Sequence, residues 1–384
     1  MNYNFDELTL RRHTGSYKWD STDDDEIIPL WVADMDFRTA PCIVEALRHR
    51  VESGIFGYVK VPESYYDALI RWFDSRHGWN IRRESVIYTS GVVPALSAII
   101  KALVKPGEGV ILHTPAYNCF FSSIRNNGCH PVAAPLLRRE NNKGFTYEID
   151  FEGLEREASR SENRILILCN PHNPTGRVWT REELEHTRDI CRRHGVTVVS
   201  DEIHCELTHP GFKYTPYLTV DPEAIACCSP SKAFNIAGLQ IANIIAPVKE
   251  ERVRIDKAIN INEVCDVNPF GVIALQEAYN HGSEWLASLN GYLYENYLFL
   301  RNELQREMPM LRVCESESTY LAWIDIRALG LTADEVEEKA KSEGKVWVNA
   351  GTMYGGQGYI RINYACPRSR LAEGLRRFVS VFGS

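Results

Sequence analysis

The sequence lacks the features that would place the chain in a membrane or on nucleic acid. No apolar run approaches the roughly 20 residues that a membrane helix needs, and the start from Met1 to Arg12 lacks the apolar core of a signal peptide. No long basic run is present and the formal net charge is −8, so nucleic acid is not an expected partner. Internal repeats and low-complexity segments are also missing. We expect a cytoplasmic protein that acts on a small molecule.

Paired cysteines are missing as well. The 11 cysteines are an odd number, and no two of them form a C-x-x-C pair. Unpaired cysteines inside apolar runs, such as Cys169 and Cys227, indicate a reducing compartment. His204, Cys205 and His209 lie close together in the sequence, but their spacing matches no common zinc pattern and no second cluster completes a tetrahedron. The sequence therefore predicts no metal site.

The pattern that is present is that of an α/β enzyme. The chain has 384 residues, of which 44% are hydrophobic, and this length suggests more than one domain. Short β-rich runs alternate with helical stretches between about residues 85 and 250, which predicts a mainly parallel sheet with helices on both faces. The expected strands are Val86–Thr89, Val110–His113, Ile165–Cys169, Val196–Ser200, Ala224–Cys228 and Ile241–Ala246.

The character of the sequence changes near residue 283, where a second unit of α+β type is predicted. Its expected helices are Ser283–Glu307, Ala333–Ser342 and one that begins at Ser369, and its expected strands are Leu311–Val313, Tyr320–Ile326, Val346–Asn349 and Tyr359–Tyr364. We therefore predict three parts: an N-terminal arm over 1–35 that packs on the small domain, a large domain over 36–282 and a small C-terminal domain over 283–384.

Lys232 follows the apolar run Ala224–Cys228 and is itself followed by aromatic, small and apolar residues. A lysine in such a place loses hydration, so its pKa falls and its neutral amine can attack a carbonyl to form a Schiff base. The hydroxyls of Ser229 and Ser231 could hold phosphate oxygens beside it. A surface lysine at a strand end is the alternative, and on this stretch alone the two interpretations are evenly matched.

Other polar residues also follow predicted strands. Asp201 needs a cationic partner, which would be either a protonated ring nitrogen of a cofactor or an arginine. Asn173 lies in the stiff loop 170–176, where it either satisfies the backbone of a turn or is aimed at a ligand. Gly91 opens a helix whose first N–H groups form a natural phosphate site. Because ligands of parallel sheets bind at the carboxyl ends of the strands, this combination predicts pyridoxal phosphate (PLP) as the cofactor.

Seven motifs in order resemble the fold-type I PLP enzymes of the class I/II aminotransferase superfamily, over essentially the whole chain. Within that superfamily the sequence is most similar to the cystathionine β-lyases of the MalY/PatB type, chiefly through WVADMDF and SKAFNIAGLQ. The resemblance implies a mainly parallel sheet of the seven-stranded type between helices, with a smaller α+β C-terminal domain. The motifs are Pro29–Phe37, Phe56–Tyr58, Thr114–Tyr117, Asn170–Gly176, Ser200–His204, Ser229–Leu239 and Arg361–Asn363.

The resemblance also implies roles for the candidate residues. Lys232 is expected to carry the Schiff base and Asp201 to pair with the pyridinium nitrogen. Tyr117 is expected to stack on the cofactor ring and to take part in catalysis, and Asn173 to donate to the phenolate oxygen and to contact the substrate. The expected phosphate ligands are Gly91, Val92, Val93, Ser229 and Ser231.

The remaining implied contacts concern the substrate and a second subunit. Arg361 is expected to clamp the substrate α-carboxylate in a bidentate fork, with Ala33 also in the substrate site. Tyr58 is expected to reach the phosphate of the neighbouring subunit, which implies a homodimer. From the sequence alone, Tyr117 and Tyr58 would be core or surface aromatics and Arg361 a salt-bridged arginine at a strand end.

Two positions depart from the pattern of most aminotransferases. Gln240 stands eight residues after the lysine, where aminotransferases usually carry a phosphate-binding arginine, and the lyase branch shares this difference. His204 stands where many relatives have a tyrosine that touches the phenolate oxygen. We include His204 among the cofactor-binding candidates, and its role stays open.

The predicted activity is PLP-dependent C–S β-lysis of L-cystathionine, cysteine or S-conjugates, which yields thiol, pyruvate and ammonia. An L-amino-acid aminotransferase would use every residue named so far and is the alternative. A further regulatory role through contact with another protein is a third interpretation. The presence of Lys232, Asp201 and Arg361 argues against a scaffold without catalysis.

Overall fold

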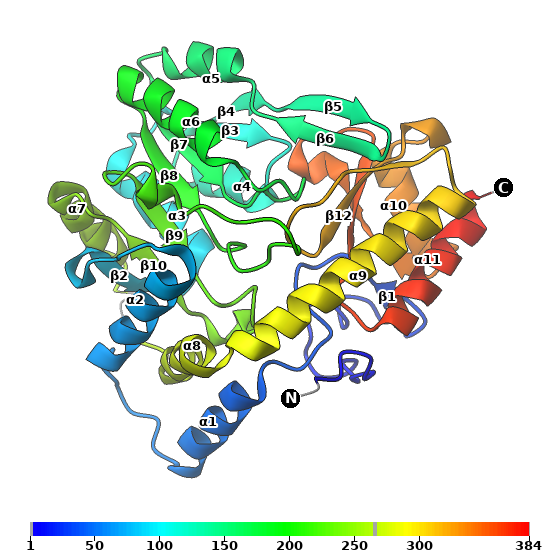
Figure 1. Ribbon diagram of the computed structural model, residues 1–384, viewed down its shortest axis with the longest axis horizontal. Coiled ribbons are helices and arrows are strands. Elements are labelled where there is room, and N and C mark those ends of the chain that lie inside the picture. The colour runs from blue at the N-terminus through cyan, green and yellow to red at the C-terminus, as the bar shows by residue number, and fades with distance from the viewer. Residues whose placement is uncertain (1–2, 264–266, 384) are drawn as a thin grey trace.

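A seven-stranded sheet forms the centre of the protein in the computed structural model, which describes residues 3–263 and 267–383 (Figure 1). The strand order is β2-β10-β9-β8-β7-β3-β4. β10 is antiparallel to both of its neighbours, and every other adjacent pair is parallel. The prediction of a mainly parallel sheet is therefore confirmed. The strands are β2 (Val86–Thr89), β3 (Gly109–Thr114), β4 (His130–Pro135), β7 (Asn163–Cys169), β8 (Thr197–Asp201), β9 (Ile225–Cys228) and β10 (Ala242–Ile245).

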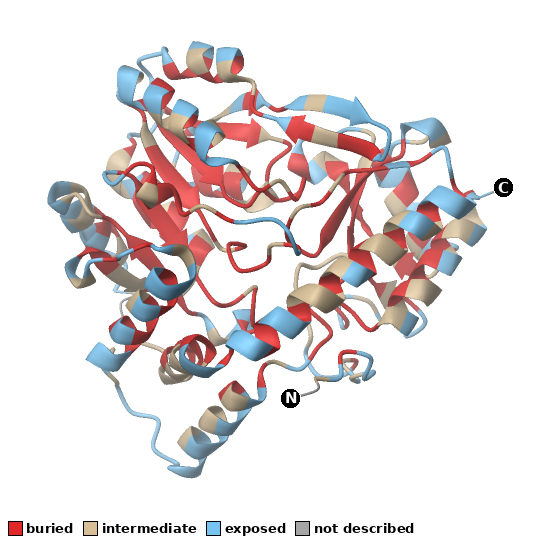
Figure 2. Ribbon diagram, viewed as in Figure 1, coloured by how far each residue is buried: buried red, intermediate tan, exposed pale blue. Residues whose placement is uncertain are grey.

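Helices cover both faces of this sheet, and each face has its own apolar core. Successive residues of β3 alternate between the cores: Val110 packs in one and Ile111 in the other. Figure 2 shows the sheet as buried between the helical layers. The helices of one face are α3 (Val92–Leu103), α4 (Asn118–Asn126) and α7 (Lys249–Asn260), and those of the other are α2 (Glu63–His77), α5 (Phe151–Ala158), α6 (Arg181–His194) and α8 (Pro269–His281). α1 (Pro41–Glu52) packs on α8.

The edge strand β4 was not predicted from the sequence. It contains Pro131 and Pro135, and several of its residues are exposed. An inner strand hydrogen-bonds to neighbours on both sides, so a proline, which has no backbone N–H, leaves one of those bonds unmade. An edge strand has one neighbour and tolerates proline. The apolar pattern that identifies the inner strands is therefore absent here.

The C-terminal part builds a second, antiparallel sheet in the order β11-β12-β15-β14. The long helix α9 (Ser283–Glu307) leads from α8 to this part (Figure 1). Its elements are β11 (Arg312–Val313), β12 (Leu321–Asp325), α10 (Ala333–Ser342), β14 (Asn349–Ala350), β15 (Tyr359–Asn363) and α11 (Arg368–Phe382). The predicted α+β character is confirmed, and the domain boundaries stay predictions.

The single strand predicted over Val346–Asn349 is wrong, because this segment forms two strands with different partners. β13 (Val346–Trp347) pairs in parallel with β1 (Ile28–Pro29) of the N-terminal arm, and β14 pairs with β15. The remaining elements are the hairpin β5 (Leu137–Asn141) and β6 (Gly144–Glu148) and the 3-10 turns η1 (Arg83–Ser85), η2 (Tyr217–Thr219), η3 (Ala237–Leu239), η4 (Arg327–Leu329) and η5 (Gly351–Tyr354). None of the described helices has the length and hydropathy to cross a membrane.

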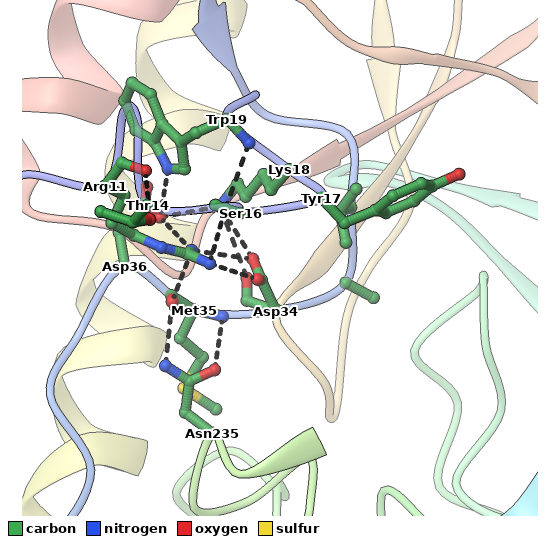
Figure 3. A network of polar contacts seen from close by, with 12 residues as sticks. Arg11, Thr14, Ser16, Tyr17, Lys18, Trp19, Asp34, Met35, Asp36 and Asn235 are labelled. Carbon is green, nitrogen blue, oxygen red and sulfur yellow. Dashed lines mark hydrogen bonds and ion pairs between the residues drawn. The ribbon is translucent and has the colours of Figure 1, made fainter. Parts of the chain in front are cut away.

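A buried group of charges ties the N-terminal arm to the rest of the protein (Figure 3). We call Arg11, Lys18, Asp34, Asp36 and Arg370 the arm cluster. The Asp36 carboxylate lies 2.7 Å from Arg11, 3.3 Å from Lys18 and 3.1 Å from Arg370. Three cations therefore surround one fully buried carboxylate, and Arg11 also binds Asp34 at 2.7 Å.

Candidate functional site

A cavity of about 210 Å³ lies at the carboxyl ends of the sheet strands, where side chains from β7, β8 and the turns after β2 and β9 meet. This is where ligands of parallel sheets bind. Ten of the predicted site residues line it, namely Ala33, Gly91, Val92, Val93, Tyr117, Asn173, Asp201, His204, Ser231 and Lys232. Arg361 contacts this group from the second sheet through Asn173.

Lys232 is partly buried, and its amine faces the cavity rather than bulk water. Nζ donates a 2.6 Å hydrogen bond to the backbone carbonyl of Ala33. Burial, followed by the nearby Arg361, lowers the pKa of Lys232 to about 8, although Asp34 and Asp201 act in the opposite direction. The neutral amine is therefore accessible near neutral pH, as a nucleophile or a base requires.

Asp201 ends β8 and is only 3% exposed. Burial raises the pKa of this carboxyl to about 7, while the N–H of Ile203 and the charge of Lys232 lower it. Among the described residues no arginine, lysine or histidine lies within ion-pair distance of it. Its carboxylate can therefore accept a cationic group of a ligand, and the arginine partner considered from the sequence does not occur in the described part of the chain.

The start of α3 supplies backbone donors to one end of the cavity. Gly91 is the N-cap and no side chain caps this helix, so the first N–H groups point to the cavity end. Ser231 lines the same cavity. Ser229 does not line it, because its hydroxyl donates to the Ile241 carbonyl at 2.5 Å and accepts the Ser231 N–H at 3.0 Å. Gln240 is exposed and also lies outside the lining.

Arg361 is a buried cation at 3% exposure. One terminal nitrogen donates to the Asn173 side-chain oxygen at 3.3 Å and the other to the Trp31 carbonyl at 3.0 Å. No carboxylate of the residues seen in the structure forms an ion pair with it, and its Nε has no hydrogen-bond partner. A buried cation without an anion is costly unless a ligand supplies one, so the position suits an anionic group of a substrate.

Two further lining side chains are uncharged. Burial raises the pKa of the Tyr117 phenol well above its usual range, so the hydroxyl stays protonated at working pH. Burial, with help from Lys232 and Arg361, lowers the pKa of His204 to about 3. The neutral His204 ring is 2% exposed, and its Nδ1 has no partner in the described chain. This nitrogen is free to contact a ligand.

Tyr58 also lies away from the cavity of its own chain. It is 95% exposed on the loop between α1 and α2, which extends from the body of the molecule in Figure 1. Ile55 and Phe56 on the same loop are 72% and 57% exposed. The cross-subunit role of Tyr58 stays a prediction.

Sequence reasoning missed several contributors to the site. Ser90 and Cys169 line the cavity and could have been found, because they lie directly at strand ends. Tyr320 could not: its hydroxyl donates to the Ala33 carbonyl at 2.9 Å, a contact between segments 287 positions apart. No local pattern in the sequence indicates such a contact.

Comparison with known proteins identifies the family. The model of the family "Aminotransferase class I and II" matches residues 25–378. The chain belongs to this family. The predicted superfamily is therefore confirmed, as is the fold-type I architecture. Within the family, the chain is 40% identical to cystathionine beta-lyase PatB of Bacillus subtilis, with 97% of this chain and 98% of that protein covered. It is 33% identical to protein MalY of Escherichia coli, with 99% and 98% covered.

Solved structures of the family agree with the fold over the full length. Cystalysin of Treponema denticola, which contains a pyridoxal 5′-phosphate cofactor, has a TM-score of 0.94 at 33% identity, with 99% of each chain covered. The PLP-bound C–S lyase of Staphylococcus hominis has a TM-score of 0.92 at 32% identity and covers 100% of this chain and 99% of its own. The resemblance to the lyase branch therefore extends to structure.

Proposed function

We propose that the chain is a PLP-dependent carbon–sulfur β-lyase that acts on L-amino acids with sulfur on the β-carbon, such as L-cystathionine, cysteine and S-conjugates. The observation that carries the proposal is one cavity lined by a lysine of lowered pKa and a buried carboxyl without an ion-pair partner, with the buried Arg361 bonded to Asn173 of its lining. The full-length likeness of the chain to proteins named as cystathionine β-lyases and C–S lyases supports the choice of reaction.

The residues of the cavity fit PLP because each polar part of that cofactor meets a complementary group. Lys232 would hold the aldehyde carbon, and the buried Asp201 carboxyl would hold a protonated ring nitrogen. Tyr117 would cover a ring face, and Asn173 or His204 would contact the ring oxygen. The uncapped start of α3 and the Ser231 hydroxyl would bind the phosphate.

The polypeptide's own groups account for binding and proton transfer. When bound, PLP would supply an aldehyde carbon that exchanges the Lys232 amine for the substrate amine, which frees the lysine, and a ring that withdraws electrons from the α-carbon. Arg361 binds the α-carboxylate and fixes the substrate beside Lys232. The neutral Lys232 amine then removes the α-proton. The bond from the β-carbon to sulfur breaks, the sulfur leaves as a thiolate, and addition of water releases pyruvate and ammonia.

The activity is tested by supplying L-cystathionine to the holoenzyme without any 2-oxo acid. We expect homocysteine thiol and pyruvate to appear in equal amounts at a steady rate, because elimination needs no second substrate. Thiol is measured with a chromogenic disulfide and pyruvate with lactate dehydrogenase. L-Homoserine, which has no sulfur on its β-carbon, is the matched negative control.

An aminotransferase is the second candidate, because the family includes enzymes of that class and both reactions begin with the same proton transfer. It predicts a different result in the same assay. Turnover that occurs strictly with added 2-oxo acid, with no free thiol, would overturn the lyase proposal. The position of Gln240 favours the lyase: it is exposed and brings no cation to the cavity, unlike the arginine that aminotransferases usually carry there.

We also propose a homodimer in which Tyr58 of one subunit reaches the cofactor phosphate of the other. The exposed apolar loop that carries Tyr58 supports this arrangement, since such side chains are normally covered in the working assembly. Arrangement of two identical subunits about a twofold axis would complete both sites at once.

A complementation experiment tests the shared site. Lys232→Ala and Tyr58→Ala proteins are each expected to be weakly active or inactive alone. After mixing and subunit exchange, activity should return to about a quarter of the wild-type value, because half of the dimers are mixed and each holds one intact site. If mixing restores nothing although native mass spectrometry, with one parent isotope-labelled, shows mixed dimers, Tyr58 acts elsewhere.

A further inference from the structure

The segment 30–37, which we call the strap, contacts both Lys232 and Arg361 through its backbone carbonyls. It has no helical or strand structure and passes between β1 and α1. Its Trp31 carbonyl accepts a hydrogen bond from Arg361, and its Ala33 carbonyl accepts one from Lys232. The group that binds the substrate carboxylate and the group that moves the proton therefore rest on the same short stretch of backbone.

The Ala33 carbonyl is placed to orient the Lys232 amine. It accepts the Lys232 Nζ–H at 2.6 Å and the Tyr320 hydroxyl at 2.9 Å, so both of its lone pairs are used. A neutral amine has two N–H groups and one lone pair. Donation of one N–H to a fixed acceptor limits rotation about the Cε–Nζ bond and so restricts where the lone pair points. The Ala33 carbonyl thus stands to the Lys232 amine as an orienting group stands to a catalytic base.

Two carboxamides hold the strap on either side of Ala33. Asn235, three residues after Lys232, accepts the Met35 N–H at 3.0 Å and donates to the Met35 carbonyl at 2.9 Å and the Phe37 carbonyl at 2.8 Å. Asn363, two residues after Arg361, donates to the Val32 and Asp34 carbonyls, the latter at 2.6 Å. The strap belongs to no regular sheet or helix and makes few backbone–backbone hydrogen bonds, such as that from the Asp36 N–H to the Ala365 carbonyl at 2.9 Å, so these amides supply partners to backbone groups that would otherwise lack them.

The backbone at Asn235 is itself unusual. Its φ is 54°, in the left-handed region that residues other than glycine and asparagine seldom adopt. This conformation turns the side chain beneath Met35, as Figure 3 shows. The strap side chains Asp34 and Asp36 point to the opposite side, into the arm cluster. The strap is therefore held from both sides, by amides on one and cations on the other.

We propose that Asn235 and Asn363 are positioning residues, which hold the strap so that the Ala33 carbonyl orients the Lys232 amine for removal of the substrate α-proton. They touch neither substrate nor cofactor in this role and act through Ala33. The inference rests on the proposed function insofar as Lys232 is the base. It does not depend on the fate of the β-substituent.

The experiment measures exchange of the α-proton of L-alanine in D₂O by NMR, with the holoenzyme. Alanine has no β leaving group, so the reading reports proton transfer alone. Asn235→Gly keeps the left-handed backbone and removes all three hydrogen bonds. We expect the maximal exchange rate to fall roughly 10- to 100-fold, as expected for a misplaced base, with an unchanged half-saturating alanine concentration. Asn363→Ala is the second variant and is expected to lower the maximal rate in the same way.

The control variant is Asn163→Ala. Asn163 is also a buried amide that donates to a backbone carbonyl, that of Glu157 at 2.7 Å, but it lies outside the cavity. It should lose stability without losing exchange. A readout independent of activity is hydrogen–deuterium exchange of the peptide spanning 30–37, which should quicken in Asn235→Gly and stay unchanged in Asn163→Ala.

The possible results separate the two proposals. Asn235→Gly and Asn363→Ala proteins that exchange alanine as fast as Asn163→Ala would overturn the positioning role. So would a loss seen solely as a higher half-saturating concentration, or a wild-type enzyme that does not exchange alanine. Normal exchange of alanine without pyruvate from cystathionine would instead overturn the lyase proposal and leave the positioning role in place.

Discussion

Lys232→Ala is expected to abolish both the covalent attachment of the cofactor and the proton transfer. Loss of a positioned base alone costs about 10²–10⁴-fold in rate, and the loss of attachment adds to it. The visible absorbance band of the lysine-linked cofactor should vanish, while the variant keeps its fold, because alanine removes a partly buried amine that makes one hydrogen bond. The measurements are absorbance spectra of wild-type and Lys232→Ala protein after incubation with PLP, and kcat for thiol release by each.

Arg361→Lys provides the matched control, because it changes the other functional cation of the same site. It should keep the absorbance band and raise KM, since an ammonium group cannot form the bidentate fork that a guanidinium offers a carboxylate. A Lys232→Ala protein that retains the band or appreciable turnover would show that another amine carries the cofactor. In that case the low pKa of Lys232 would reflect burial without function.

The sequence predicted the part of the site that belongs to the parallel sheet. Asp201 and Asn173 each lie at or just after the end of an apolar strand, and parallel strands end at the same edge, so their proximity is a consequence of topology. Lys232 comes after the next strand in the sheet and joins them for the same reason. Residues at strand ends are predictable in position because the strand itself is recognised by its apolar run.

Side-chain direction in irregular segments could not be predicted. Ser229 lies three residues before Lys232, yet its hydroxyl points to the Ile241 carbonyl just before β10 instead of into the cavity. Asn363 and Tyr320 reach the site from the second sheet, and their contacts depend on how two distant parts of the chain pack. Local sequence patterns carry no information on either point.

Asp36→Asn is expected to destabilise the protein by about 3–5 kcal/mol, because it removes the buried anion that three buried or half-buried cations share and leaves Arg11 and Lys18 with Asp34 alone. Arg11, Lys18 and Arg370 all lie within 3.3 Å of this carboxylate, whose side chain is fully buried. Urea unfolding at neutral pH, followed by tryptophan fluorescence, measures the change. The matched control is Glu373→Gln, which removes a carboxylate paired with two arginines on the surface and should cost less than about 1 kcal/mol.

The pH dependence of this difference identifies its cause. Burial by itself would raise the pKa of Asp36, but Lys18, Arg370, Trp19 and Arg11 outweigh it, and the net pKa is lowered. A carboxyl with a lowered folded-state pKa contributes stability that is fully present above its unfolded pKa, near 4, and is lost as pH falls through the folded value. The difference in free energy of unfolding between Asp36→Asn and wild-type protein should therefore begin to shrink below about pH 4 and close as pH falls through the lower folded-state pKa of Asp36. A difference that persists unchanged at lower pH would assign the loss to packing rather than to charge.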